Sequence, residues 1–469
     1  MNKDTVINKL KDHYSLIYLI IALLLFNYFL GNFINKELWI DELFCIFVVS
    51  HKHLSIIQFL VEHDTNPPLF FLVLHVWHKL FQLDPFNLRI LPILLSSISF
   101  IFLYRLFIKR GLLTIAYALP IYLFTSHIYI FHTIDLRPYS FFILGICMSM
   151  YALYSPGDDK QLLNKILYVL GISIALYSHN FAMIFWFSQF VIYLIFYKWV
   201  RTFSFKELFK LNVFVFIIYL PWLVNIPSQL KNSRAISWIE PLGKGTLINL
   251  DFWFHTFDYT PLVVLFCLQL IWMLYKRESM RLIVALKVFL HISAAALFII
   301  ICDYLGKHLF QVRYLQQTFI SMYVFIALLF YFPKYQKILG VFLMAFLVFK
   351  IQTFSIIKFK NDTQGWTSDW KLLAKELKHK NQENLSIVFE PYYFNTPILV
   401  HDPSLKLIPL EEIKKHQFEV SNPFYFYINH QTKEEIESFF KKDFPFKNCK
   451  AVELRNDIRS LSLAKILCD

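Results

Sequence analysis

Acidic side chains stand directly beside bilayer-length apolar stretches at two places in the N-terminal part of the chain. Asp41 and Glu42 follow the first apolar stretch, and Asp64 and Asn66 precede a pair of prolines that opens another. Carboxylates are costly to keep near lipid, so their presence there indicates a function. A partly buried carboxylate has a raised pKa, which suits a general base that takes the proton from a hydroxyl group. The alternative is structural, because the same side chains could cap the N-termini of short helices.

Cationic and aromatic polar side chains occur at three later boundaries between apolar and polar sequence. Asp135, Arg137 and Tyr139 form one group, and His179 and Arg313 occupy the other two boundaries. The planar guanidinium group of arginine binds phosphate through paired hydrogen bonds. Several such groups on one face would hold a phosphate and stabilise it as a leaving group. The alternative is that Arg and Tyr anchor helix ends among the lipid headgroups.

The composition is that of a membrane protein. Of the 469 residues, 57% are hydrophobic and 52 are Phe, which is more apolar side chain than a soluble protein of this length can bury. The excess of 46 Lys+Arg over 33 Asp+Glu does not indicate a nucleic-acid partner. The basic residues form short clusters between apolar stretches, where they set membrane topology. Residues 16–30 lack a small-residue cleavage site, so we expect a retained first span and no cleaved signal peptide.

Eleven segments are apolar enough to cross a bilayer, although 139–154 and 164–178 are short. They are residues 14–34, 88–107, 112–131, 139–154, 164–178, 180–197, 209–226, 258–275, 281–303, 313–332 and 337–354. Residues 69–81 are also apolar but are interrupted by His and Lys. If 69–81 does not cross, all the basic clusters fall on one side, which the positive-inside rule assigns to the cytoplasm. We therefore expect a juxtamembrane helix at 69–81, about eleven transmembrane helices and a cytoplasmic N-terminus.

This topology places the polar candidates on the outer face of the membrane. The outer segments are residues 35–87, 132–138, 178–180, 227–257, 304–312 and the tail from 356. The tail alternates between helical and strand patterns, with helices expected at 369–380 and 432–442 and strands at 386–390 and 424–429. The sequence therefore predicts two domains, a transmembrane catalytic domain at 1–355 and a small extracytoplasmic α/β domain at 356–469.

The cysteines and histidines do not form a recognisable metal site. The six Cys include no C-x-x-C pair. Four histidines follow no established zinc spacing, and no metal ligands are predicted among them; they are His75, His78, His127 and His132. Cys449 and Cys468 could form a disulfide if the tail is extracytoplasmic, and the sequence leaves their pairing open.

Seven short segments occur in a characteristic order along the chain. They are Trp39-Ile40-Asp41-Glu42, Asp64-Thr65-Asn66-Pro67-Pro68-Leu69-Phe70, Phe86-Asn87-Leu88-Arg89-Ile90-Leu91-Pro92, Asp135-Leu136-Arg137-Pro138-Tyr139, Tyr177-Ser178-His179-Asn180, Arg313-Tyr314 and Asp369-Trp370. In this order and spacing the set resembles the polyprenyl-phosphate-sugar-dependent glycosyltransferases of the GT-C superfamily. It is most similar in appearance to the protein O-mannosyltransferase, aminoarabinose-lipid A transferase and rhizobial lipopolysaccharide sugar transferase groups.

The resemblance implies a role for each acidic side chain in the first outer loop. Asp41 would be the catalytic base, with Glu42 beside it, and Asp64 would be a second acid of the site. Asn66 stands where many relatives have His, which keeps the loop geometry but puts a role for its side chain in doubt.

The resemblance also implies a site for the donor phosphate and a reaction. Arg137 and Arg313 would face the lipid phosphate, His179 would lie with them, and Asp135 and Tyr139 would complete the site. An acceptor hydroxyl would attack the anomeric carbon with inversion as polyprenyl phosphate leaves. The partners would be the polyprenyl-phosphate-linked sugar, a lipid, glycan or protein acceptor, and the bilayer. No nucleotide is needed, in keeping with the absence of a Gly-rich phosphate loop, and dependence on a divalent metal is left open.

A membrane transporter or lipid flippase is the main alternative, and a membrane scaffold is another. Transporters place ionisable residues near the bilayer midplane and break helices there with Gly or Pro. This chain has only 10 Gly, and the expected spans carry almost no charge at their centres. The sequence therefore favours a surface enzyme over a transport path. The compact loops and basic turns point to the inner membrane of a bacterium.

Overall fold

The structure is a computed structural model that describes part of the chain. The described residues are 16–25, 27–28, 30–31, 34, 38–50, 53–81, 84–124, 127–155, 161–195, 203–231, 271, 275, 294, 297–306, 370–380, 385–390, 395–410, 413, 420–429, 432–443, 449–455 and 461–468. The chain divides into two compact units. The first contains Met1–Asn35 and His53–Ser355, and the second contains Lys36–Lys52 and Ile356–Asp469.

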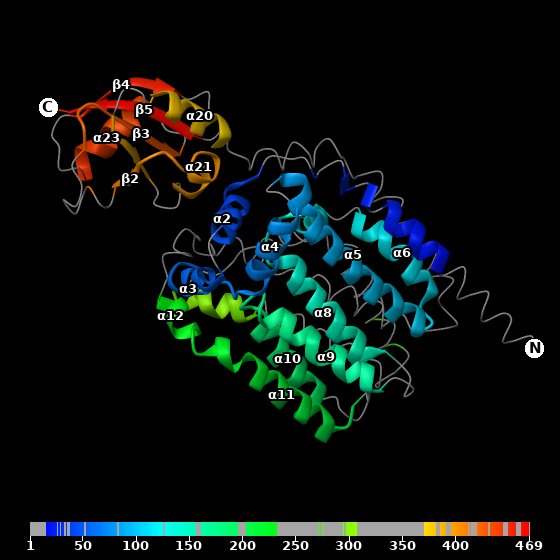
Figure 1. Ribbon diagram of the computed structural model, residues 1–469. Helices are drawn as coiled ribbons and strands as arrows, with labels where there is room; N and C mark the ends of the chain where they lie inside the picture. The colour runs from blue at the N-terminus through cyan, green and yellow to red at the C-terminus, as the bar shows by residue number, and fades with distance from the viewer. Residues whose placement is uncertain are drawn as a thin grey trace, which may run out of the picture. The chain divides into compact units, whose positions relative to one another are not determined.

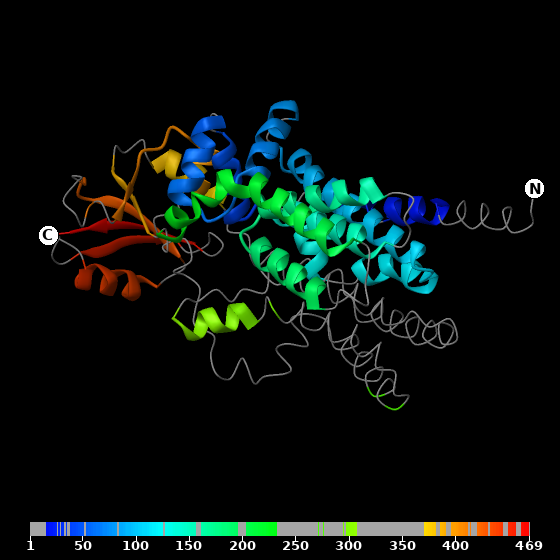
Figure 2. The same ribbon diagram turned by 90° about the horizontal axis from the view of Figure 1, so that it is seen from below.

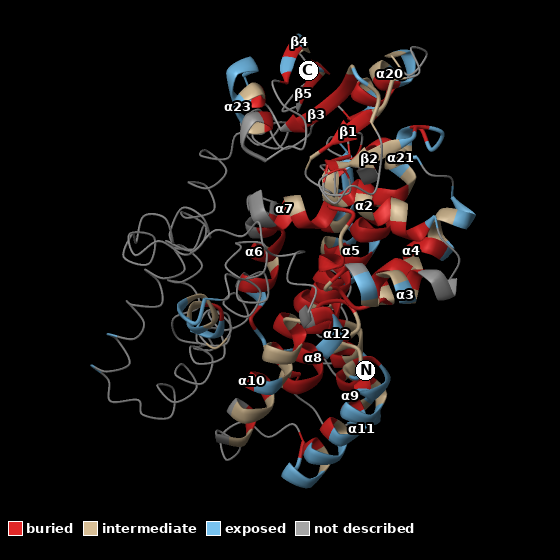
Figure 3. Ribbon diagram, turned by 90° about the vertical axis from the view of Figure 1, so that its left-hand side faces the viewer, coloured by how far each residue is buried: buried red, intermediate tan, exposed pale blue. Residues whose placement is uncertain are grey.

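The first unit is helical throughout its described part (Figure 1). It begins with the helix Leu16–Leu25. The helices that follow are α3 (His53–His63), α4 (Leu69–Leu80), α5 (Pro85–Lys109), α6 (Leu113–Phe124), α7 (His127–Ile134), α8 (Tyr139–Tyr154), α9 (Gln161–Leu176), α10 (Ala182–Ile195), α11 (Phe205–Leu223) and α12 (Ile226–Lys231). Helix α8 is buried over almost its whole length, as Figure 3 shows. Helix α11 instead exposes large apolar side chains such as Phe209, Phe214 and Ile217, and such a surface suits lipid.

Helices occur at seven of the expected spans. The first of these spans, 14–34, contains the apolar helix Leu16–Leu25. Residues 88–107 lie within α5, 139–154 match α8, and α9, α10 and α11 overlap the next three expected spans. The expected span 112–131 overlaps both α6 and α7. Helix α5 is the one helix in the described part of the chain that is both long and apolar enough to cross a membrane. The expected spans 313–332 and 337–354 lie outside the described residues, and 258–275 and 281–303 lie mostly outside them.

The close packing of α8 on α9 depends on two glycines. A Cβ atom added to Gly145 would lie 2.4 Å from the backbone oxygen of Gly171 and 2.7 Å from the backbone nitrogen of Ala175. Real Cβ contacts are not this short, so only glycine lets the two backbones approach in this way. The pair fixes the distance between α8, which follows the turn at 135–138, and α9, which precedes the turn at 178–181.

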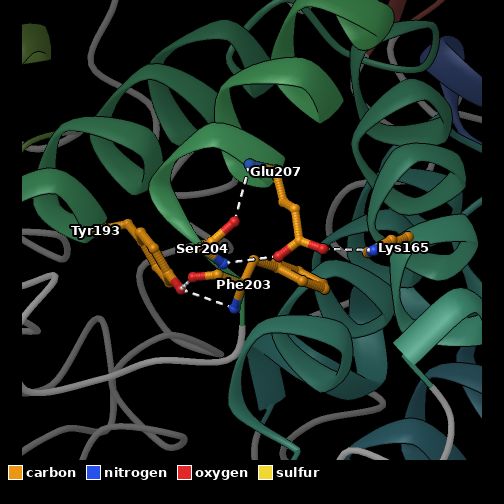
Figure 4. A network of polar contacts seen from close by, with 5 residues as sticks. All are labelled: Lys165, Tyr193, Phe203, Ser204 and Glu207. Atoms are coloured by element: carbon orange, nitrogen blue, oxygen red, sulfur yellow. Dashed lines mark hydrogen bonds and ion pairs between the residues drawn. The ribbon is translucent and has the colours of Figure 1, made fainter.

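Polar side chains join α9, α10 and α11 near the N-terminus of α11 (Figure 4). Lys165 Nζ lies 2.7 Å from Glu207 Oε1. Ser204 caps α11, because its hydroxyl accepts from the backbone N–H of Glu207 at 3.2 Å, and Glu207 Oε2 accepts from the backbone N–H of Ser204 at 2.9 Å. The Tyr193 hydroxyl accepts from the backbone N–H of Phe203 at 3.0 Å and donates to the carbonyl of the same residue at 2.8 Å.

The second unit contains a five-stranded sheet in the order β2-β1-β3-β5-β4. The strands are β1 (Ile387–Phe389), β2 (Leu407–Pro409), β3 (Phe424–Asn429), β4 (Lys450–Arg455) and β5 (Leu461–Leu467). Strand β1 pairs in parallel with β2 and β3, whereas β5 pairs antiparallel with β3 and β4. The helices are α2 (Ile40–Val49), α20 (Trp370–Lys380), α21 (Asn395–His401) and α23 (Lys433–Asp443).

Helices α20 and α23 cover opposite faces of this sheet, as Figure 2 also shows. On one face, Phe424 and Phe426 of β3 pack with Phe440 of α23 in the core of the unit. Tyr425, which alternates with them, lies on the other face, where Lys380 of α20 sits 4.9 Å from its ring. The alternation follows from the period of two in a strand, so the aromatic run of β3 fills both faces.

Four expected elements of the tail occur in the structure. The helix expected at 369–380 is α20, the strands expected at 386–390 and 424–429 are β1 and β3, and the helix expected at 432–442 is α23. Strands β2, β4 and β5 and helix α21 were not expected. Cys449 and Cys468 are joined by a disulfide, which ties the start of β4 to the end of β5.

One expectation for residues 35–87 requires correction. The sequence predicted one helix there, at 69–81, whereas the structure has three, because α2 and α3 precede α4. Within the same segment, Lys36–Lys52, which contains α2, groups with Ile356–Asp469 in the second compact unit. The reason is a packing contact that the local sequence does not reveal, since α2 packs against α21 of the tail.

Candidate active site

Asp64 is a buried carboxylate in the turn between α3 and α4, with a relative exposure of 7%. Its Oδ1 accepts from the backbone N–H of Thr65 at 2.7 Å and from Asn66 Nδ2 at 3.2 Å. Pro68 occupies the N-cap position of α4 without a side-chain cap. Asp64 and Asn66 therefore do not cap α4; they hold the turn itself, which is what an Asx turn does.

Two amide side chains from distant elements hold the same turn. Asn180, between α9 and α10, donates through Nδ2 to the backbone carbonyl of Thr65. Gln229 of α12 donates through Nε2 to the carbonyls of Asp64 at 3.2 Å and Asn66 at 3.3 Å. The amide oxygens of Asn180 and Gln229 are buried without a hydrogen-bond partner among the residues described. Each amide thus uses its donor on the turn and keeps an acceptor available.

Arg137 supplies positive charge to this carboxylate from the turn between α7 and α8. Burial raises the pKa of Asp64 above its ordinary value, and the charge of Arg137 acts in the opposite direction. The turn is held locally, because the backbone N–H of Arg137 donates to the carbonyl of Asp135 at 2.8 Å. Asp135 is itself buried, with 3% exposure. The structure therefore brings an acid and an arginine from two turns into one electrostatic environment.

His179 lies among aromatic rings at the turn between α9 and α10, with 6% exposure. Its ring stacks on Phe142 and Phe181, each with a centroid separation of 5.4 Å. Tyr139 lies 5.6 Å from His179 and 5.0 Å from His132. Because His179 Nδ1 accepts from the backbone N–H of Phe181 at 3.2 Å, the neutral ring carries its proton on Nε2. This nitrogen is then a hydrogen-bond donor.

Asp41 and Glu42 lie in the first turn of α2 and belong to the second unit. Glu42 is 2% exposed, and its Oε2 accepts from the backbone N–H of Trp39 at 3.2 Å. That contact is the capping role expected as the structural alternative. Asp41 is partly exposed, so it is the one of the pair better placed to meet a substrate.

The structure thus joins most of the predicted site residues of the first unit. The turns at 64–68 and 178–181 are joined by the hydrogen bond from Asn180 to the Thr65 carbonyl. The turn at 135–138 is linked to them through the ring contact of Tyr139 with His179 and the effect of the Arg137 charge on Asp64. Arg313 lies outside the described residues. No group of three or more His, Cys, Asp or Glu that could hold a metal occurs in the described part of the chain.

Sequence reasoning did not single out Gln229 or assign a role to the Asn180 side chain. Asn180 stands in a segment that carried the resemblance, which is the signal that could have identified it. Gln229 lies near the start of the segment 227–257, which the sequence predicted to be outside, and nothing in the surrounding residues marks it. Its contact with Asp64 joins residues 165 positions apart.

Comparisons with known proteins agree with the resemblance. Residues 65–224 match the family described as dolichyl-phosphate-mannose-protein mannosyltransferase. The apo crystal structure of ArnT from Cupriavidus metallidurans is similar with a TM-score of 0.60 at 8% sequence identity, covering 97% of this chain and 98% of that one. Its structure bound to undecaprenyl phosphate gives a TM-score of 0.52 at 10% identity, covering 96% and 98%. A comparison with curated protein sequences gives no match.

The family match contains all three turns of the candidate site from Thr65 onward, and the structural match extends over nearly the whole chain. ArnT is a GT-C glycosyltransferase. The similarity to the GT-C superfamily expected from the sequence is therefore confirmed: this chain has the GT-C fold, and over residues 65–224 it carries the sequence pattern of the dolichyl-phosphate-mannose-protein mannosyltransferase family.

Proposed function

We propose that the protein is an inverting glycosyltransferase of the membrane, which moves a sugar from a polyprenyl-phosphate donor to a hydroxyl group of a cell-envelope acceptor. The observation that carries the proposal is the buried Asp64 turn, held by amides from two other elements and facing the charge of Arg137. A buried carboxylate that feels the charge of an arginine suits a phosphate-linked sugar. The acid binds sugar hydroxyls, and the arginine binds phosphate.

Arg137 is the proposed ligand of the donor phosphate. Its guanidinium would stabilise the charge that develops as the polyprenyl phosphate leaves, and the Nε2 proton of His179 would give a further hydrogen bond. Arg313 stays a proposal from the sequence alone. The ArnT structure that contains undecaprenyl phosphate supports a lipid phosphate as the kind of leaving group.

Asp41 is the proposed general base, and Asp64 is proposed to orient the donor sugar. Asp41 would take the proton of the acceptor hydroxyl as its oxygen attacks the anomeric carbon in line with the leaving phosphate. One in-line displacement inverts that carbon. Glu42 has a smaller proposed part, because its carboxylate accepts from the backbone N–H of Trp39, the N-cap residue of α2.

The proposed membrane arrangement is that of the sequence prediction, with about eleven transmembrane helices, a cytoplasmic N-terminus and the 356–469 domain outside. The disulfide between Cys449 and Cys468 supports the outer position of that domain, because disulfides persist in oxidising compartments. The inner membrane of a bacterium is the proposed location. The acceptor, whether lipid, glycan or protein, would meet the donor on this outer side.

The alternative of a transporter or flippase has less support among the described residues. Its ionisable residues would lie midway along the helices. Asp64, Arg137 and His179 instead occupy turns between helices, as a surface enzyme requires.

The test is binding of undecaprenyl phosphate to the full-length protein in nanodiscs, measured by native mass spectrometry. Wild type should retain the lipid, and Arg137→Ala should weaken its binding by about tenfold or more, since a charged hydrogen bond to phosphate is lost. Arg105→Ala, which removes an exposed arginine of α5, is the matched control and should bind as wild type does. Equal binding by both variants would remove Arg137 from the donor site.

A further inference from the structure

The charged residues of helix α20 in the second unit fall into two sets, one paired with the sheet and one exposed. Glu376 and Lys380 face the sheet, where they pair with Arg455 at 2.6 Å and Glu453 at 3.4 Å on β4. Their charges are thereby neutralised within the unit. Leu373, Ala374 and Leu377 are buried, so the packing side of the helix is complete without its remaining lysines.

Those lysines form a stripe on another side of α20. Lys371, Lys375 and Lys378 are all exposed, and their spacing of four and three positions places them on one helix face. Lys378 pairs with Asp402 at 3.0 Å. Lys371 and Lys375 have no ion-pair partner among the residues that the structure describes. The stripe therefore keeps two uncompensated positive charges.

The lysine stripe lines a groove of about 560 Å³ between α20 and α21. Asp402, which closes one part of the groove, is already engaged, because it accepts hydrogen bonds from the hydroxyl and backbone N–H of Ser404 as well as pairing with Lys378. These contacts hold the pKa of Asp402 down at about 2, with the Ser404 hydroxyl as the main cause. The groove is thus large enough for a sugar ring, and the positive charges of Lys371 and Lys375 are not paired with an acid among the described residues.

The groove also has a structural connection to the proposed base. Helix α21 packs against α20 on one side and against α2, which carries Asp41, on another. All three helices belong to the second unit. A molecule held against α20 and α21 would therefore be bound by the same unit that carries Asp41.

We propose that this lysine-lined groove binds the acceptor through an anionic group, so that the acceptor is a saccharide bearing a phosphate or carboxylate. The proposal deepens the proposed glycosyl transfer and rests on it. Lys371 and Lys375 bind the anion, the 560 Å³ groove receives the adjoining sugar ring, and a free hydroxyl of the same molecule is the group that Asp41 deprotonates. The lysines are binding residues and take no part in the displacement.

The experiment measures saccharide binding by the full-length protein in neutral-lipid nanodiscs, with lysine side chains observed as ¹³C-dimethylated amines by NMR. The probes are glucose 6-phosphate, glucose and inorganic phosphate. The charge-reversed variant is Lys371→Glu with Lys375→Glu. The control is Lys406→Glu with Lys433→Glu, which reverses two exposed lysines elsewhere in the same unit.

Glucose 6-phosphate should shift the Lys371 and Lys375 signals saturably, and glucose should not. The charge-reversed variant should bind it about tenfold or more weakly, because two charged hydrogen bonds are lost, whereas the control should bind as wild type does. Equal binding of inorganic phosphate would overturn the proposal, since the sugar would then contribute nothing. Equally weakened binding in the control variant would also overturn the proposal.

The same lysine shifts on adding phosphatidylglycerol to the nanodisc would show that the lysine stripe binds the membrane surface instead of a saccharide. The binding assay does not depend on turnover. If glucose 6-phosphate does not bind, the acceptor proposal fails while the proposed glycosyl transfer is unaffected. If glycosyl transfer is disproved by another experiment, the measured binding of glucose 6-phosphate still holds.

Discussion

The side-chain amide of Gln229 donates to the backbone carbonyl of Asp64 at 3.2 Å, and so joins helix α12 to the turn that carries the buried acid. Asn180 holds the neighbouring carbonyl of Thr65. The conformation of the Asp64 turn is therefore determined by three separate parts of the chain, and the acid is oriented before any substrate arrives. Such preorganisation is what a transferase site requires.

Replacing Gln229 with Leu should disturb this turn. The carbonyls of Asp64 and Asn66 would lose a buried donor, which costs about 1–3 kcal/mol of folding free energy. We expect lower thermal stability in detergent and a fall in kcat for sugar transfer. Gln161→Leu, at an exposed position of α9, is the control and should leave both unchanged. Unchanged kcat in Gln229→Leu would show that the hydrogen bonds from Gln229 to the Asp64 turn do not affect sugar transfer.

Replacing Arg137 with Gln should move the acid limb of the pH–rate profile. Burial raises the pKa of Asp64 and the charge of Arg137 lowers it, so loss of that charge raises the pKa further. If Asp64 acts in its ionised form, activity is lost as the pH falls through this pKa, and the limb of the residual kcat/KM shifts to higher pH. Arg137→Lys keeps the charge and should keep the limb in place. An identical shift in both variants would contradict the electrostatic link.

Replacing Gly145 with Ala should separate α8 from α9. The added Cβ would lie 2.4 Å from the Gly171 carbonyl oxygen, and overpacking of this kind costs about 1–3 kcal/mol. Thermal unfolding should occur at a lower temperature. Gly31→Ala is the control, because nothing lies within 4 Å of its added Cβ. Equal stability of the two variants would mean that the helices do not approach this closely.

The contact between Glu207 and Lys165 should make stability depend on pH. Hydrogen bonding to Lys165, followed by Ser204, lowers the pKa of Glu207 from 4.5 to about 2. The folded pKa is below the unfolded one, so the stabilisation is present above about 4.5 and is lost as the pH falls toward about 2. The difference in melting temperature between wild type and Glu207→Gln should shrink across that range. A constant difference would contradict the assignment.

The spacing of apolar residues predicted those helices and strands whose conformation follows from their own sequence. Helix α20 was expected within a residue of its N-terminus because Trp370, Leu373, Ala374 and Leu377 recur at helical spacing, and β3 was expected because its aromatic run can fill both faces of a sheet. Strands β4 and β5 were missed, because neither their antiparallel pairing nor the disulfide between Cys449 and Cys468 can be read from the residues within each strand.

The same distinction applies to the candidate site. Asp64 was singled out because a carboxylate beside apolar segments carries a cost that marks it, and Arg137 because a guanidinium group binds phosphate. Gln229 carries no charge, and its role depends on a contact across 165 positions. The contact of α2 with α21, which assigns Asp41 to the second unit, is equally non-local.

The role of Asp41 as the catalytic base is tested most directly by mass spectrometry of envelope glycans and lipids from cells that carry Asp41→Asn, compared with wild type. Expression of both proteins is confirmed in the membrane fraction, and Asp303→Asn, outside the proposed site, serves as the control. We predict that one sugar is missing from one class of acceptor in Asp41→Asn and present in the control, which would identify sugar and acceptor together. Full retention of every sugar in Asp41→Asn would contradict the assignment of Asp41 as the catalytic base.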